Sequence, residues 1–126
     1  MAVNRLTTPN VISLEASGDL STLLHRIVMV DDNGRVAVNT SNSTACLGVL
    51  LNKPSGIGQA ARVAVNGSIV KCEAGAAINE RDRIRAVTGG RGSATTTATD
   101  QIVGVALSAA AGSGALFELQ VNTETG

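Results

Sequence analysis

His25, Cys46 and Cys72 are the side chains of this 126-residue chain best suited to acid–base or metal chemistry. A general base or a triad member would have to be His25, because the sequence contains one histidine. His25 follows Leu24 and stands close to Ile27, and this apolar setting favours a structural role. One histidine and two distant cysteines do not have the ligand spacing of a four-ligand zinc site. We therefore expect no catalytic residue, no bound metal and no enzymatic activity.

Two further segments carry residue types that bind phosphate or calcium. Gly56–Ala61 fits the spacing G-x-G-x-x-A of dinucleotide-binding loops, which follow a strand and open a helix. Here Lys53–Ser55 precedes the segment and an expected strand follows it, which argues against a nucleotide site. Asp31–Gly34 lacks the alternating ligand spacing and the closing glutamate of a calcium loop. We expect both segments to be turns, and no cofactor.

Charge and composition restrict the classes of partner. Ten basic residues balance ten acidic ones, and the one aromatic residue is Phe117. Nucleic-acid binders need positive charge or aromatic platforms, so no nucleic-acid partner is expected. No apolar run approaches the roughly 20 residues of a membrane span, and the N-terminus has no apolar signal stretch. We expect no membrane association, synthesis in a cytoplasm, and free cysteines in a reducing compartment.

The sequence repeats itself, and this is its most informative feature. An offset of 56 in residue number places Gly48-Val49 on Gly104-Val105, whereas an offset of 57 places Arg26-Ile27 on Arg83-Ile84. The change of offset would fall in the turn 31–33, where insertions are cheap. We expect two pseudo-repeats, at about 16–67 and 73–123, within a β domain of residues 15–126.

Short β-favouring runs separated by turns fill most of the repeat. Asn66-Gly67 between the runs 62–65 and 68–71 predicts a hairpin, and a second hairpin is expected around the turn 31–34. Apolar and polar residues alternate over 116–121, which predicts a half-buried strand. The side chains that should face inward in this strand are Phe117, Leu119 and Val121.

Two runs are apolar on both faces, and one segment has helical spacing. Leu47–Leu51 and Ile102–Leu107 predict central strands whose glycines, Gly48 and Gly104, allow a bulge or a close neighbour. Asp19–Ile27 is the best helix candidate, with Asp19 as its N-cap. Together these patterns predict an all-β protein: a small β-barrel or β-tulip-like fold built from two internal repeats, with an extended N-terminal arm of residues 1–14.

The arm carries apolar side chains without evident partners in the chain, and Pro9 biases Thr8 toward extended geometry. Such an arm can dock on another subunit, for instance by adding a strand to an exposed sheet edge. A disordered terminus or an ordinary first strand is the alternative. A charged turn around residue 82 is a second candidate contact. The candidate residues for contact with another protein subunit are Val3, Arg5, Leu6, Pro9, Val11 and Ile12 in the arm and Arg81, Asp82 and Arg83 in the turn.

Several segments of the second half follow each other in an order found in one known family. They are the small-residue segment Glu73–Ile78, the charged turn and strand Asp82–Ile84, the Gly-Val-Ala-Leu strand Ile102–Leu107, an Ala/Gly loop 108–114 and the closing strand 116–121. Over about residues 16–122 the chain resembles the phage capsid cement or head-decoration family. Members often have Gly-Asp where this chain has Arg81-Asp82.

The resemblance implies small barrel-like or tulip-like subunits, frequently homotrimers, on the outer capsid surface where capsid subunits meet, and it brings no catalytic residues. We therefore expect a virion protein, made in the host cytoplasm, that cements the mature capsid by bridging neighbouring subunits of the major capsid protein. The alternative is a particle-displayed β module that binds glycan or a host surface. Such modules usually stack sugars on aromatic rings, and this chain has one aromatic residue.

Overall fold

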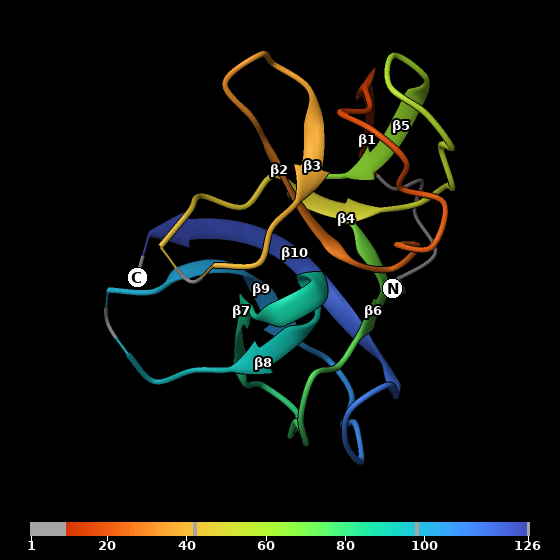
Figure 1. Ribbon diagram of the computed structural model, residues 1–126. Helices are drawn as coiled ribbons and strands as arrows, with labels where there is room; N and C mark the ends of the chain where they lie inside the picture. Colours follow the sequence, from red (N-terminus) through yellow and green to blue (C-terminus); the bar gives the residue numbers. More distant parts are fainter. Residues whose placement is uncertain (1–9, 42, 98, 126) are drawn as a thin grey trace, which may run out of the picture.

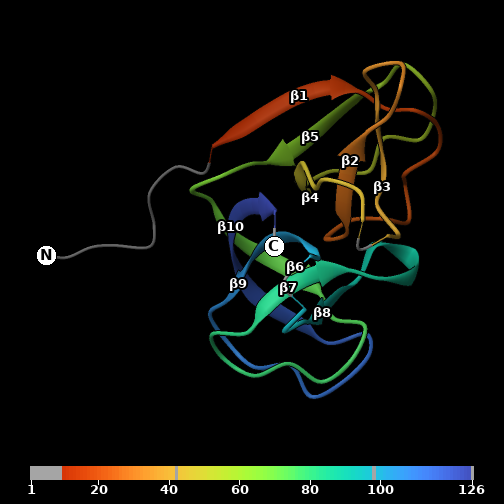
Figure 2. The same cartoon turned by 90° about the vertical axis from the view of Figure 1, so that its left-hand side faces the viewer.

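A computed structural model describes residues 10–41, 43–97 and 99–125 of the chain. The strands form two antiparallel five-stranded sheets, which we call the first lobe and the second lobe (Figures 1 and 2). The first lobe contains β1 (Val11–Glu15), β2 (Ile27–Val30), β3 (Val36–Val38), β4 (Gly48–Leu50) and β5 (Ala60–Ala64). The second lobe contains β6 (Ile69–Glu73), β7 (Arg83–Ala86), the 3-10 turn η1 (Thr88–Gly90), β8 (Gly92–Ala94), β9 (Gln101–Ala106) and β10 (Leu116–Thr125). The all-β prediction is confirmed.

The two lobes have the same topology. Their strand orders are β1-β5-β4-β2-β3 and β6-β10-β9-β7-β8, so each strand of the first lobe has a counterpart five strands later. Neither sheet closes into a continuous barrel. One isolated parallel bridge joins the two ends of each sheet, Ala16 to Val36 in the first lobe and Ala74 to Gly92 in the second. The arrangement is therefore two open, tulip-like sheets, one per repeat.

The strand pairs show how the lobes correspond. From β2 onward the offset in residue number is 56, because Val28 pairs with Gly48 and Val38 as Ile84 pairs with Gly104 and Ala94. The offset of 57 that places Arg26-Ile27 on Arg83-Ile84 is therefore wrong. Val28 and Ile84 are both fully buried, and a slip of one residue would turn one of them to the opposite face of its sheet.

The strands β1 and β6 correspond with a larger offset of 58, from Val11 to Ile69. Leu20 donates its N–H to Pro54 as Ile78 does to Ala110, so the offset of 58 persists to residue 20. The two extra residues of the first lobe thus lie between Leu20 and Leu23, and not in the turn 31–33. They lengthen a turn and not a strand, and an insertion in a turn leaves the sheet pairing intact.

Two local predictions are wrong. Asn66-Gly67 does form a tight turn with Gly67 at φ 96°, but the strands that it joins belong to different sheets. It links the lobes because β5 is already paired on both edges, with β1 and β4. The expected helix over Asp19–Ile27 is a pair of turns ending at His25, whose φ of 69° is incompatible with an α-helix.

The other predicted elements agree with the structure. β2 and β3 form the expected hairpin, and Phe117, Leu119 and Val121 of β10 are buried. β4 and β9 lie at the centre of their sheets. A Cβ at Gly48 would overlap the backbone oxygen of Ala64, and one at Gly104 would overlap that of Gln120. Each glycine therefore permits a close approach of two central strands.

Each lobe has its own apolar core, and the two cores meet. The core of the first lobe includes Val28, Leu50 and Val63. The core of the second lobe includes Phe117 and also takes in Ile27 and Val49 from the first. The lobes therefore pack as one body, with Ile27 of β2 and Val49 of β4 on the first lobe's side of the contact.

Candidate interaction site

The described part of the predicted arm is a paired strand. Val3, Arg5, Leu6 and Pro9 lie outside the described residues. Val11 and Ile12 belong to β1, where they pair with Ala64 and Val63 of the same chain. β1 is an edge of the first lobe's sheet, and Ile12 is partly exposed on it. Residues 11–14 thus occupy a sheet edge, the place where a further strand can add.

The predicted charged turn lies in the other lobe. Arg81 is exposed, and its N–H donates to the carbonyl of Ala106 at 2.7 Å. The Asp82 carboxylate accepts the Asn79 N–H at 2.9 Å, and Arg83 begins β7. Arg81 has a φ of 73°, the left-handed conformation that suits glycine. The cement family that the chain resembles often has Gly-Asp at this turn, and a glycine at position 81 would adopt this conformation without strain.

Arg81→Gly should therefore stabilise the protein. A left-handed backbone costs a non-glycine residue on the order of 1–3 kcal/mol, and the greater freedom of glycine in the unfolded chain offsets about 0.4–1 kcal/mol of it. We expect the free energy of unfolding in urea to rise by roughly 1 kcal/mol. Arg81→Ala removes the same charge but keeps the Cβ, so it should give no gain. Equal gains for both variants would assign the effect to charge instead.

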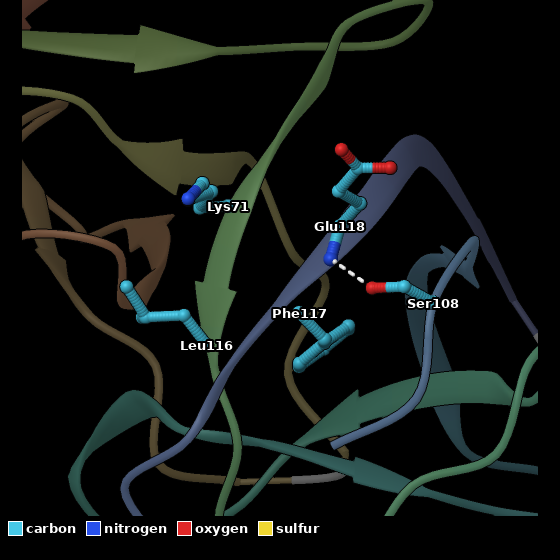
Figure 3. Close-up of a pocket in the computed structure, with 5 residues that line it drawn as sticks. All are labelled: Lys71, Ser108, Leu116, Phe117 and Glu118. Carbon is cyan, nitrogen blue, oxygen red and sulfur yellow. Dashed lines mark hydrogen bonds between the residues drawn. The ribbon is translucent and has the colours of Figure 1, made fainter.

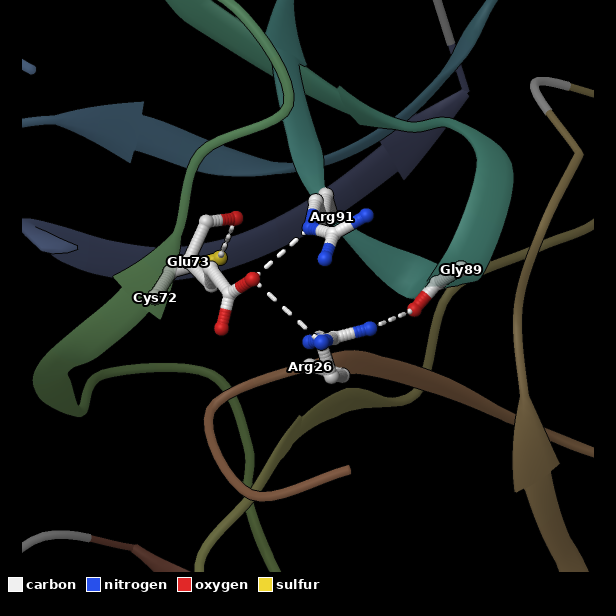
Figure 4. A network of polar contacts seen from close by, with 5 residues as sticks. All are labelled: Arg26, Cys72, Glu73, Gly89 and Arg91. Carbon is white, nitrogen blue, oxygen red and sulfur yellow. Dashed lines mark hydrogen bonds and ion pairs between the residues drawn. The ribbon is translucent and has the colours of Figure 1, made fainter. Parts of the chain in front are cut away.

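An ion-pair network joins the lobes (Figure 4). The Glu73 carboxylate at the end of β6 accepts a hydrogen bond from Nε of Arg91 at 2.7 Å and lies 3.3 Å from Nη2 of Arg26. Arg26 also donates through Nη1 to the carbonyl of Gly89 at 2.6 Å. Arg26 precedes β2 of the first lobe, whereas Glu73, Gly89 and Arg91 belong to the second. One carboxylate thus holds an arginine from each lobe.

The same surroundings set the charge state of Glu73. Partial burial by itself raises its pKa, but the hydrogen bond from Arg91 and the charges of Arg26 and Arg91 outweigh that effect and lower the pKa below its usual value. Glu73 is therefore ionised throughout the neutral range. This network was absent from the sequence-based candidates.

His25 lies at the same contact between the lobes. Its N–H donates to Leu50 at 3.1 Å, and its carbonyl accepts from Glu73 at 3.0 Å. The His25 Nδ1 atom is buried without a hydrogen-bond partner among the described residues. Within the same residues, no group of three or more His, Cys, Asp and Glu side chains is arranged to hold a metal ion.

Both cysteines are free thiols. Burial raises the pKa of Cys46 to about 11 and that of Cys72 to about 12. Because the thiolate is the reactive form, we expect the folded protein to react with iodoacetamide at about pH 8 far more slowly than a free thiol. The urea-unfolded chain should react at both positions. Labelling of Cys72 in the folded state as fast as in the unfolded state would contradict this burial.

A shallow depression of about 330 Å³ lies beside β10 and is lined by Lys71, Ser108, Leu116, Phe117 and Glu118 (Figure 3). Ser108 Oγ accepts the backbone N–H of Glu118 at 2.9 Å. In the first lobe the Asn52 side chain accepts the equivalent N–H, that of Arg62, at 3.0 Å.

Two exposed apolar side chains of the first lobe lie in the β4–β5 loop and at the end of β2. Ile57 is 65% exposed in the β4–β5 loop, which is held by a hydrogen bond from the Ser55 N–H to the Gln59 side chain at 2.8 Å. The N–H of Gly58 donates to Ala16 at 3.0 Å, which brings this loop against the end of β1. Val30, at the end of β2, is 44% exposed.

In the part of the chain that the structure describes, no helix combines the length and the apolar character needed to span a membrane.

Comparisons with known proteins give a structural match. No family model matches the sequence, and no curated protein matches it. A solved structure does: the crystal structure of the head fiber gp8.5 N base in bacteriophage phi29, with a TM-score of 0.67 and 16% sequence identity. The match covers 91% of this chain and 95% of that chain. At this identity the likeness shows a shared fold, and its coverage extends over both lobes.

Proposed function

We propose that the chain is a structural protein of a phage virion that binds the outer surface of the mature head. The observation that carries this proposal is the match, over nearly the full length of both chains, to the base of a phage head fiber. The order of motifs in the second half, which resembles cement proteins, supports the same location.

The finer proposal is that the protein cements the head. One oligomer, a homotrimer by analogy with the resembling family, would contact several subunits of the major capsid protein. Each contact then raises the effective concentration of the next, so weak contacts add up to firm binding. A protein that binds the expanded lattice alone stabilises that lattice by mass action. Its candidate contacts are the β1 edge with Ile12 and the exposed turn at Arg81.

Heads that lack this protein, incubated with the purified chain, would test the proposal. We expect the chain to cosediment with expanded heads and not with unexpanded ones, and to raise the temperature at which expanded heads release DNA. Unexpanded heads serve as the matched control, since they contain the same capsid protein in another lattice. If the chain bound neither expanded nor unexpanded heads, the proposed virion role would be contradicted.

A fiber base is the second candidate, and the name of the matched structure favours it. A base must attach to the head but has no need to bridge capsid subunits. Binding to expanded heads without any increase in heat resistance would support this candidate and contradict cementing. The glycan-binding alternative has no comparable support in the structure.

A further inference from the structure

Asn-Gly pairs occur twice in the sequence, as Asn33-Gly34 and Asn66-Gly67. Such a pair can modify its own backbone. The glycine nitrogen bonds to the amide carbon of the asparagine side chain, and the amide group leaves with the proton of that nitrogen as ammonia. Water then opens the resulting five-membered succinimide ring, which gives aspartate or isoaspartate. Glycine favours the attack because it has no Cβ to restrict the approach of its nitrogen.

The Asn66-Gly67 pair is held by contacts from other segments. The Asn66 Oδ1 atom accepts the N–H of Thr123 at 2.8 Å and its hydroxyl at 3.1 Å. The backbone carbonyl of Asn66 accepts Nδ2 of Asn10 at 2.7 Å, and the Gly67 N–H donates to Val121 at 2.9 Å. A Cβ on Gly67 would lie 2.8 Å from the same Nδ2 atom. Both reacting groups are therefore fixed by β10 and by the residue before β1.

The Asn33-Gly34 pair lies in the open turn between β2 and β3, at the top of the first lobe in Figure 1. Both residues are exposed, and a Cβ on Gly34 would find no atom within 4 Å. The Asn33 side chain has no hydrogen-bond partner among the described residues. The Gly34 N–H donates to the carbonyl of Asp31, within the same turn, at 3.1 Å. This amide is therefore free to rotate onto the glycine nitrogen.

We propose that Asn33-Gly34 is a site of spontaneous backbone modification, at which the folded protein slowly converts Asn33 to aspartate and isoaspartate while Asn66 is protected. The Gly34 nitrogen is the nucleophile, and water is the one co-reactant. Each glycine N–H must give up one hydrogen bond before the attack, but the Asn66 side chain must also leave both of its bonds to Thr123. Losing two such hydrogen bonds corresponds to a reaction slower by about tenfold or more.

The modification changes the turn that holds β2 and β3 in register. The Asp31 carboxylate accepts the N–H groups of Asn33 at 2.9 Å and of Arg35 at 3.0 Å, and the Asp31 N–H donates to the carbonyl of Arg35 at 2.8 Å. Isoaspartate inserts a methylene group into the backbone inside this set of hydrogen bonds. Val36, the first residue of β3, is fully buried, so a distorted turn should lower the stability of the first lobe.

Incubation of the purified protein in mildly alkaline buffer, followed by peptide mapping with mass spectrometry, tests the proposal. In the folded protein, the amide of Asn33 should be lost at least about tenfold faster than that of Asn66. In urea the two amides should be lost at comparable rates. The unfolded chain is the matched control, because it contains the same two Asn-Gly pairs without the contacts that distinguish them. The measurement uses the isolated chain, so its outcome does not depend on head binding.

Asn33→Gln separates this modification from other effects of incubation. Its longer side chain would have to close a six-membered ring, which forms far more slowly. After incubation the unmodified sequence should unfold at a lower urea concentration than before, whereas the Asn33→Gln protein should keep its midpoint. Equal rates of amide loss at Asn33 and Asn66 in the folded protein would overturn the proposal. So would an Asn33 amide that outlasts the Asn66 amide, or an equal loss of stability in the variant.

Discussion

Gly104→Ala is expected to remove a large part of the stability of the protein. The added Cβ would overlap the carbonyl oxygen of Gln120 and lie 3.0 Å from its carbonyl carbon and 3.2 Å from the Asn122 nitrogen. All three atoms are backbone atoms of β10, so no side-chain rotation can relieve the contact. β9 and β10 would have to separate at the centre of the second lobe.

The cost should reach or exceed the upper end of the roughly 1–3 kcal/mol typical of overpacking, a large part of the total stability of about 5–15 kcal/mol of a small domain. Gly48→Ala should behave alike, because its Cβ would meet Ala64 in the same way. Gly112→Ala is the control, with no atom within 4 Å of the added Cβ. Urea unfolding measures all three, and a Gly104→Ala protein as stable as the control would contradict the close pairing of β9 and β10.

Glu73→Gln should produce the second large effect, a loss of roughly 1–3 kcal/mol of stability. The substitution removes the charge that Arg26 and Arg91 share. The two guanidinium groups would then face each other across the lobe contact without a counter-ion. Thermal unfolding near neutral pH should detect this as a lower midpoint.

The same substitution should change the pH dependence of stability. Because the folded-state pKa of Glu73 is lowered, its ionised form stabilises the protein above the unfolded-state pKa. That contribution is lost as the pH falls through the lowered folded-state pKa. Glu73→Gln should therefore flatten the acid side of the stability profile.

Glu15→Gln is the matched control, since it breaks the counterpart pair in the first lobe. That pair is exposed, with side-chain exposures of 35% for Arg35 and 62% for Glu15, so its removal should cost at most about 1 kcal/mol. Equal losses for Glu15→Gln and Glu73→Gln would show that Glu73 does not hold the two lobes together.

The strands that could be predicted from the sequence are those with a strong local pattern. The alternation over 116–121 identified the buried face of β10, since a strand with one face in the core repeats every two residues. The turn between β2 and β3 indicated a hairpin. Gly48 and Gly104, in runs that are apolar on both faces, indicated close approach of central strands.

The predictions that failed depend on contacts between distant residues. Asn66-Gly67 has the right chemistry for a hairpin turn, but β5 was already paired on both edges. Asp19–Ile27 has helical spacing, yet its Leu20 N–H bonds to Pro54 in a later loop. The offset of 57 followed an identity, Arg-Ile, that the sheet pairing does not preserve. Sequence pattern alone does not specify the sheet edge with which a given strand pairs.

The ion-pair network was missed although one signal for it was present. Gly34-Arg35 falls on Gly90-Arg91 at the offset of 56, and the partners Glu15 and Glu73 fall together at 58. The change of offset between them concealed the recurring pair. Arg26 could not be found in this way, because Asp82 stands at its counterpart position and the contact between lobes occurs once in the chain.

Electron cryomicroscopy of virions with and without this protein would test the proposed virion role most directly. Virions that contain it should show additional density on the outer head surface into which the two-lobed fold fits. Virions that lack its gene should lose that density and regain it when the purified chain is added. Identical head surfaces in both preparations, with the chain absent from purified virions, would contradict the role.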